Sequence, residues 1–118
     1  MTGGEFAGPR LGGEVLPGGG DWLFIRPDGT WELDVRITLR THDGALIYVR
    51  FPGLNVVPPA VQERQRRGER VASTEYYFRV TPAFETAAEP YRWLNDLIVV
   101  GVGETLADGV RYRVYAIR

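Results

Sequence analysis

The sequence predicts an all-β protein that folds as a single compact antiparallel β-barrel with a short helical turn. Glycine and proline, present 15 and 8 times, interrupt the chain at short intervals. The stretches between them are rich in Val, Ile, Tyr, Phe and Thr, the residue types that favour strands. Two Asp-Gly turns join segments that alternate between apolar and polar residues. A length of 118 residues suits one domain, 1–118, of which 1–8 is expected to be a flexible tail.

The glycine and proline residues divide the chain into six expected strands, and a further short strand is possible within residues 10–16. The six strands are expected near residues 21–26, 30–41, 45–52, 74–81, 96–103 and 109–118. The charged run "VQERQRRGER", residues 61–70, fits an exposed loop or a short helix, and a solvated segment is favoured over an anion-binding patch. The segment "PYRWLN", residues 90–95, fits one helical turn that covers an end of the sheet.

The composition excludes several classes of chemistry. The chain has no cysteine and no lysine, which excludes thiol catalysis, disulfides, Schiff-base formation and a phosphate-loop lysine. A single histidine, His42, argues against a zinc site, and no metal site is predicted. The reactive side chains that remain are carboxylates, tyrosines and arginines. These suit proton transfer and oxyanion stabilisation without a cofactor.

The net charge and the first residues of the chain indicate which partners and which cellular location to expect. A formal net charge of −1 gives no general attraction to nucleic acid or to an anionic membrane. No apolar run approaches the roughly 20 residues that span a bilayer. The first residues, "MTGGEFAGPR", lack the basic start and apolar core of a signal peptide, so a cytoplasmic location is expected.

The two Asp-Gly turns, "RPDGT" at 26–30 and "THDGA" at 41–45, set the pairing of three strands. Each fits either a two-residue hairpin loop or a three-residue loop with glycine in a left-handed bulge. The three-residue form is favoured because Pro27 suits a type I turn and because this register keeps similar residues on one face. The predicted partners are Ile25–Trp31, Phe24–Glu32, Leu23–Leu33 and Trp22–Asp34, with Ile47, Val49 and Phe51 beside Leu39, Ile37 and Val35.

This register gives the three strands two different faces. One face is aliphatic and contains Leu23, Ile25, Leu33, Val35, Ile37, Leu39, Ile47 and Val49. The other mixes aromatic and charged groups and contains Trp22, Phe24, Glu32, Asp34, Arg36, Thr38, Tyr48 and Arg50. Two interpretations follow from the pattern. Either the aliphatic face is the core and the mixed face is surface, or the mixed face lines a binding cavity and a second subunit covers the aliphatic face.

The second half of the chain adds further candidate site residues. Tyr77 and Arg79 share one face of the strand near 74–81, where they fit either a cation–π pair or a ligand site. Glu85 and Asn95 fall in the loop that follows, and either can instead satisfy backbone groups. Trp93 fits a lid over the core or a platform for a ligand.

Four ordered stretches, "LPGGGDW", "DGTWELDVRITLRTHDGALIYVR", "EYYFRVTPAFET" and "YRWLN", resemble a bacterial and fungal family called domain of unknown function 3237. The resemblance runs from about residue 8 to residue 116. It implies a compact β-barrel and a site around the charged matches, and it favours the interpretation in which the mixed face lines a cavity. It implies no reaction. The matched residues are Asp34, Arg36, Arg79, Glu85, Trp93 and Asn95.

The leading functional hypothesis is a cofactor-free enzyme for a small organic molecule, of the cyclase, isomerase or hydro-lyase type. Asp34 or Glu32 would transfer a proton, and Arg36 would hold an oxyanion in the barrel cavity. The substrate-binding residues are expected to be Trp22, Phe24, Tyr48, Arg50, Tyr77, Arg79, Glu85, Trp93 and Asn95.

Two alternatives stay open. The same residues fit a non-catalytic protein that binds a hydrophobic or anionic small molecule, and a structural domain with no ligand would show a fully packed interior. In the first two cases the expected partners are a small-molecule ligand and further copies of the chain, as a homodimer or larger homo-oligomer. No nucleic-acid or membrane partner is expected.

Overall fold

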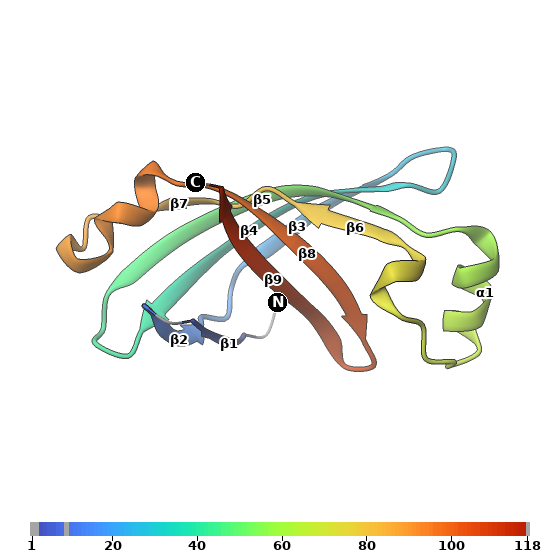
Figure 1. Cartoon of the computed structure of the whole chain (residues 1–118), viewed down its shortest axis with the longest axis horizontal. Helices are drawn as coiled ribbons and strands as arrows, with labels where there is room; N and C mark the ends of the chain where they lie inside the picture. The colour runs from blue at the N-terminus through green and yellow to red at the C-terminus, as the bar shows by residue number, and fades with distance from the viewer. Residues whose placement is uncertain (1–2, 9, 118) are drawn as a thin grey trace.

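A computed structural model describes residues 3–8 and 10–117, and Figure 1 shows how they fold. The described strands are β1 (Gly4–Ala7), β2 (Gly12–Val15), β3 (Gly20–Ile25), β4 (Trp31–Thr41), β5 (Leu46–Val56), β6 (Tyr77–Val80), β7 (Ala83–Glu85), β8 (Ile98–Leu106) and β9 (Gly109–Ile117). The described helices are α1 (Pro59–Arg66) and the two 3₁₀ helices η1 (Ser73–Glu75) and η2 (Glu89–Asp96).

All of these strands belong to one antiparallel sheet in the order β1-β2-β4-β5-β6-β8-β9. β3 pairs with the first part of β4 and β2 with its last part, while β7 pairs with β5. The sheet curls strongly, so that β1, β2, β8 and β9 fold under β4 and β5 (Figure 1). The predicted all-β, barrel-like architecture is therefore confirmed as a curled half-barrel.

Both Asp-Gly turns have the predicted three-residue form. In the first, the N–H of Arg26 donates to the carbonyl of Thr30 at 2.8 Å, and Gly29 has a φ of 90°. In the second, the N–H of Thr41 donates to the carbonyl of Ala45 at 2.9 Å, and Gly44 has a φ of 87°. Glycine adopts this left-handed conformation without steric cost. The cross-strand register predicted for β3, β4 and β5 is confirmed in full.

Contacts between distant strands show which face of the sheet lies inside. Phe51 on β5 and Tyr112 on β9 lie three strands apart, a distance of roughly 14 Å in a flat sheet. Their ring centroids are only 5.1 Å apart, and those of Phe78 and Tyr112 are 5.5 Å apart. The sheet must therefore curl toward the face that carries these rings. That concave face is the aliphatic face of β4 and β5.

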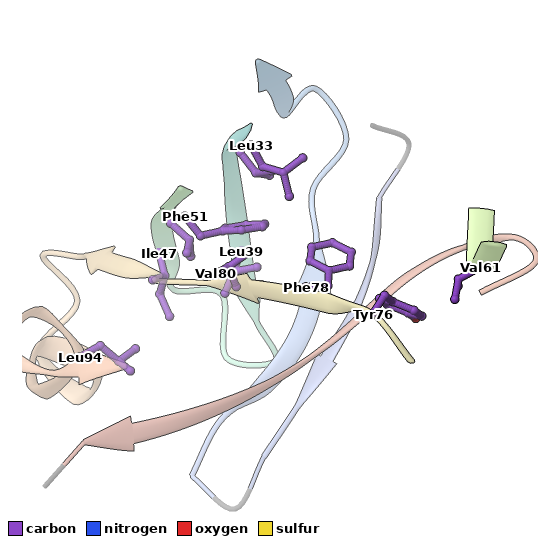
Figure 2. Packing of buried hydrophobic residues seen from close by; sticks show 11 residues of the cluster. Leu33, Leu39, Ile47, Phe51, Val61, Tyr76, Phe78, Val80 and Leu94 are labelled. Carbon is purple, nitrogen blue, oxygen red and sulfur yellow. The ribbon is translucent and has the colours of Figure 1, made fainter. Parts of the chain in front are cut away.

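The core fills this concave face (Figure 2). Its buried residues from the sheet include Leu33, Val35, Leu39, Ile47, Val49, Phe51, Phe78 and Val80. Two glycines of β8 let large side chains of β6 approach closely. A Cβ on Gly103 would lie 2.6 Å from the ring of Phe78, and a Cβ on Gly101 would lie 2.6 Å from Val80.

The prediction that Glu32, Asp34 and Arg36 line the cavity is wrong. They lie on the convex face, where Arg36 is exposed and the other two are half-buried. Burying the aliphatic residues is favourable by about 25 cal/mol for each Å² of apolar surface, whereas burying charges costs several kcal/mol for each ion. The aliphatic face is therefore the interior, and no second subunit is needed to cover the middle of β4 and β5.

Other boundaries differ from the sequence-based expectations. Residues 4–7 of the expected tail pair with β2 as strand β1, while residues 1 and 2 lie outside the described residues. The loop expected around Glu85 contains a short strand, β7, which pairs with β5 and places Phe84 opposite Val49. The helical turn expected at 90–95 is confirmed within η2.

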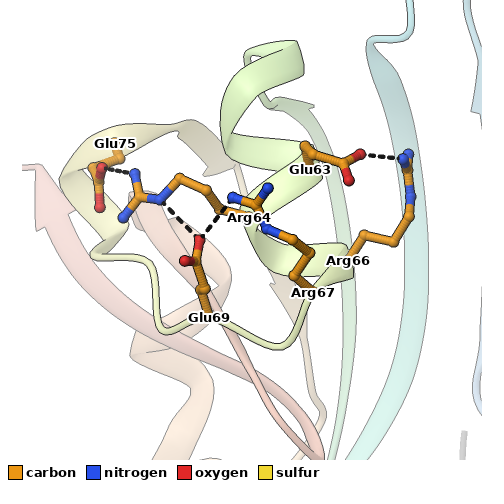
Figure 3. Close-up of polar contacts among 6 residues, drawn as sticks. All are labelled: Glu63, Arg64, Arg66, Arg67, Glu69 and Glu75. Atoms are coloured by element: carbon orange, nitrogen blue, oxygen red, sulfur yellow. Dashed lines mark hydrogen bonds and ion pairs between the residues drawn. The ribbon is translucent and has the colours of Figure 1, made fainter.

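The charged run at 61–70 forms α1 and the turn after it, and most of its arginines pair with glutamates (Figure 3). Arg64 donates to Glu75 at 2.5 Å and lies 3.5 Å from Glu69, which Arg67 also contacts at 3.3 Å. Arg66 contacts Glu63 at 2.5 Å. These pairs offset the positive charge. Within residues 3–8 and 10–117, no helix has the length and hydropathy needed to cross a bilayer.

Candidate functional site

The register brings most of the predicted site residues together, but on the convex face. Trp22 lies opposite Asp34, Phe24 opposite Glu32, and Arg36 opposite Arg50. The adjacent strands extend this face, and its further members from the predicted site are Tyr48, Tyr77, Arg79 and Glu85. Sequence reasoning therefore found the neighbours correctly and assigned them to the wrong side of the sheet.

An exposed ion pair occupies the centre of the convex face. Arg36 donates to Asp34 at 3.3 Å, and its guanidinium lies 5.5 Å from the ring centroid of Trp22. The hydrogen bond from Arg36 to Asp34 raises the pKa of the guanidinium, with a smaller contribution from Tyr48. The second carboxylate oxygen of Asp34 is buried and has no hydrogen-bond partner among the described residues. Glu32 is held separately by Arg26 at 2.6 Å.

Because the side chains of Arg36 and Asp34 are 43% and 42% exposed to solvent, replacing either member of the central ion pair should change stability little. Asp34→Asn and Arg36→Ala are each expected to change the free energy of unfolding by less than about 1 kcal/mol. Val35→Ala, between them in sequence but on the buried face, should cost about 2 kcal/mol. Urea unfolding of the three variants checks this, and a large loss for Asp34→Asn would show that its buried oxygen has a structural role.

The remaining convex-face residues form local contacts. The guanidinium of Arg79 lies 4.9 Å from the ring centroid of Tyr77, and it donates to the carbonyl of Phe78 at 2.9 Å. The cation–π interpretation of this pair is thus confirmed. Glu85 lies opposite Tyr48. Arg50 makes no ion pair with another described residue, which leaves it the less constrained of the two central arginines.

Trp93 and Asn95 lie on η2, away from this cluster. Trp93 packs against the core, with the guanidinium of Arg10 3.9 Å from its ring centroid. Asn95 accepts from the N–H of Thr86 and donates to the carbonyl of Thr86, both at 2.9 Å. Asn95 therefore satisfies backbone groups, as one of the two interpretations expected.

The paired hydrogen bonds of Asn95 should contribute measurably to stability. Asn95→Ala is expected to lower the free energy of unfolding by about 1 to 2 kcal/mol, since it leaves a backbone N–H and a carbonyl of Thr86 without these partners. Asn95→Asp keeps the acceptor and loses the donor, and it should fall between the alanine variant and the natural protein. Thermal or urea unfolding provides the comparison, and equal stability of all three would contradict this role.

Sequence reasoning missed a carboxylate on the concave face. Asp21 on β3 lies opposite Val35, so the register places it on the same side of the sheet as the core. Burial raises its pKa above the ordinary value of 3.8, the nearby charge of Asp34 raises it further, and a backbone hydrogen bond with Asp34 partly opposes both. The sequence pattern could have identified Asp21, because the register that puts Trp22 on the charged face necessarily puts Asp21 among aliphatic residues.

Tyr112 lies close enough to Asp21 for the charge of the carboxylate to affect its pKa. Burial raises the pKa of its hydroxyl to about 12, and the charge of Asp21 adds to the effect. The hydroxyl therefore stays protonated at neutral pH and can donate a hydrogen bond. Its ring is held edge-on to Phe51 and Phe78, two members of the core.

The open end of the concave face is largely apolar, although the register also places Asn55, opposite Trp31, and Thr105, opposite Val110, on this face. Exposed side chains from β3, β4 and β9 surround it, namely Leu23, Ile25, Trp31, Val110 and Val114. By register, Asp21 is the one charged residue on the concave face of the described strands. Such a surface suits an uncharged, largely apolar molecule and a single proton-transfer group.

A separate hollow of about 810 Å³ lies between the β1–β2 hairpin and the end of β4. Its charged lining includes Glu5 together with Glu14 and Arg40, which form an ion pair with each other. His42, the single histidine of the sequence, also borders it. Because Glu14 and Arg40 neutralise each other, the hollow offers weaker chemical grounds for a reaction than Asp21 and Tyr112 do.

Comparisons with known proteins agree with this architecture. A UPF0311 protein of Clostridium acetobutylicum is 40% identical over 114 residues, which cover 97% of this chain and 72% of that protein. The crystal structure of a beta-barrel like protein from Acinetobacter baumannii superposes with a TM-score of 0.84 at 36% identity, covering 99% of this chain and 74% of the other.

A more distant relative has a named activity. A hydroalkoxylation enzyme of Penicillium herquei is 31% identical over 109 residues, which cover 92% of this chain and 57% of that enzyme. The crystal structure of an enzyme from the same organism superposes with a TM-score of 0.67 at 26% identity. The family model described as "Protein of unknown function (DUF3237)" matches residues 1–117, so the chain belongs to this family, as the ordered motifs predicted.

Proposed function

We propose that the protein is a cofactor-independent enzyme that transfers a proton within an uncharged small molecule bound on the concave face. The observation that carries the proposal is Asp21, the one charged residue that the described strands place on the concave face, and a carboxylate whose pKa is raised there. A carboxylate of this kind can accept a proton and return it more readily than one fully exposed to water. Tyr112 is the accompanying neutral donor.

The proposed reaction is addition of an O–H group across a C=C bond that is conjugated to a carbonyl. Asp21 accepts the hydroxyl proton while the oxygen bonds to the β-carbon, and the π electron pair moves to give an enolate. Tyr112 donates a hydrogen bond to the enolate oxygen. Asp21 then returns a proton to the α-carbon, so the overall change is redox-neutral and consumes no co-reactant.

Two lines of support favour this reaction class over the others. The relative from Penicillium herquei is named for hydroalkoxylation, which is addition of an O–H group to an alkene. The described strands place no arginine on the concave face by register, so an anionic substrate lacks a counter-charge from them. The arginine anchoring expected from the sequence would require the convex face, and the catalytic role predicted for Glu32, Asp34 and Arg36 stays a prediction.

The test uses 2′-hydroxychalcone, an uncharged, flat molecule whose phenol closes onto its own enone to give flavanone. Ring closure removes the long-wavelength absorbance of the chalcone, so the rate above the spontaneous reaction can be followed directly at neutral pH. In D₂O the product should carry one deuterium at the α-carbon. Recovery of the probe unchanged but bound would favour the alternative of a binding protein, and neither binding nor turnover would contradict both.

A further inference from the structure

Asn55 on β5 is an uncharged polar residue between two aromatic neighbours on the concave face. It lies opposite Trp31 on β4 and opposite Phe78 on β6, so β5 is paired on both sides at this position. The side-chain oxygen of Asn55 is buried and receives no hydrogen bond from any described residue. A buried carbonyl without a donor is unfavourable, and an apolar side chain of similar shape would avoid this cost. Packing therefore gives no reason for an amide here.

The amide lies on the same face as the two groups of the proposed reaction. Phe78, its partner on β6, has its ring centroid 5.5 Å from that of Tyr112. Asp21 and Asn55 pair with residues of β4 that are four positions apart. That spacing is about 13 Å along the strands, and β3 and β5 lie about 10 Å apart across β4. A molecule with one ring cannot span this separation, whereas a molecule with two rings can.

We propose that Asn55 determines substrate specificity by accepting a hydrogen bond from a second hydroxyl group, at the end of the substrate remote from the reacting oxygen. Rotation about the last bond of the side chain turns the amide oxygen toward the bound molecule. The substrate class is then a flat, uncharged molecule of at least two rings with a hydroxyl group at each end. This inference rests on the proposed function, because Asp21 fixes where the reacting hydroxyl lies.

A pair of chalcones differs only in this hydrogen bond. The first, 2′,4-dihydroxychalcone, carries the second hydroxyl on its distal ring. The other, 2′-hydroxy-4-methoxychalcone, carries a methyl ether at the same position, which cannot donate a hydrogen bond but has a similar electronic effect on the enone. After subtraction of the spontaneous reaction, the natural protein should show a kcat/KM at least tenfold higher for the dihydroxy compound, because the ether leaves the amide oxygen unpaired.

Variants of Asn55 test whether the amide causes this preference. Asn55→Leu should reduce it to less than twofold, while turnover of the methyl ether changes by less than threefold. Asn55→Ala, which cannot overpack the site, should lose the preference in the same way. Thr105→Val is the matched control, since Thr105 is another uncharged polar residue on the concave face, and it should keep the preference. A preference that persists in both Asn55 variants, or that disappears in Thr105→Val, would overturn the proposal.

Thermal unfolding gives a readout that does not depend on turnover. Asn55→Leu should raise the melting temperature by about 4 °C, because it removes a buried oxygen that has no partner among the described residues. This shift is opposite in sign to the one expected for Asn95→Ala, whose amide is already paired within the protein. A lower melting temperature for Asn55→Leu would show that the amide has a structural role and would contradict the proposal.

Equilibrium binding separates this proposal from the proposed function. Asp21→Asn blocks the proposed proton transfer, so the Kd of each chalcone can be measured in this variant without turnover. If the natural protein turns over neither chalcone but Asp21→Asn binds the dihydroxy compound at least tenfold more tightly, the proposed reaction is wrong and the role of Asn55 holds. Equal turnover of both chalcones would support the reaction and contradict the role of Asn55, and neither binding nor turnover would contradict both.

Discussion

Asp21→Asn should lower kcat for 2′-hydroxychalcone at least a hundredfold while changing KM little. The amide keeps the size and most of the polarity of the side chain but cannot accept the phenol proton, and a positioned general base contributes about a hundredfold to ten-thousandfold. The rate of the natural protein should fall as the pH drops through the pKa of Asp21, which burial places above 3.8. The Asn variant should lack this dependence.

The same substitution should affect stability in the opposite direction. Because the pKa of Asp21 is raised in the folded protein, the folded state binds more protons than the unfolded state between 3.8 and the raised pKa. Stability therefore falls as the pH rises through this interval and stays reduced above it. Asp21→Asn should raise the urea midpoint at pH 7, and this gain should vanish below pH 3.8.

Asp34→Asn provides the matched control for the reaction. It removes a carboxylate one position along the ladder, on the opposite face. If the concave face is the site, this variant should keep activity within about threefold of the natural protein. If Asp34→Asn abolishes turnover and Asp21→Asn does not, the convex face predicted from the sequence is the site and the proposed function is wrong in its location.

Phe78→Ala should lower the free energy of unfolding by about 3 to 5 kcal/mol, the range for removing a buried aromatic ring. The ring is 3% exposed, and it contacts Tyr112 and lies over Gly103. Its loss leaves a cavity between β6 and β9 and removes one of the two rings that hold Tyr112. Urea unfolding measures the stability, and turnover of the chalcone probe should also fall.

A second substitution shows whether Phe78 acts through this close contact. Gly103→Ala adds a Cβ that would lie 2.6 to 2.8 Å from three ring atoms of Phe78, so it should destabilise the natural protein. In a Phe78→Leu background the ring is gone, and the added methyl group should cost much less. Additive effects in this double-mutant cycle would contradict direct contact.

The turn chemistry allowed the pairing of β3, β4 and β5 to be predicted residue by residue. Pro27 and the two Asp-Gly pairs constrain the loops, and the alternation of β4 then fixes which residues share a face. Which face lies inside is a different question, because it depends on the curl of the whole sheet. That curl comes from contacts between distant segments, such as Phe51 with Tyr112, which local pattern does not encode.

The same distinction explains which site residues could be found. Alternation identified Trp22, Asp34 and Arg36 as neighbours because they are charged or aromatic in a regular pattern. Asp21 is a single polar residue in the otherwise aliphatic pattern of the other face. One such residue is a weaker indication of a site than a regular series of charged and aromatic residues. The role of Tyr112 depends on burial by residues from β5 and β6, so it could be recognised only in the folded sheet.

The short strand β6 has a consequence for how the molecule unfolds. The β3–β5 meander and the β8–β9 hairpin are each built from neighbours in sequence, and β6 joins them through four pairs on one side and two on the other. Opening the two-pair side would release the hairpin and expose Tyr112 while leaving the meander intact. Hydrogen exchange at the amides of β8 and β9 should therefore reveal a partial opening, with a lower free energy than global unfolding, that would give access to the concave face.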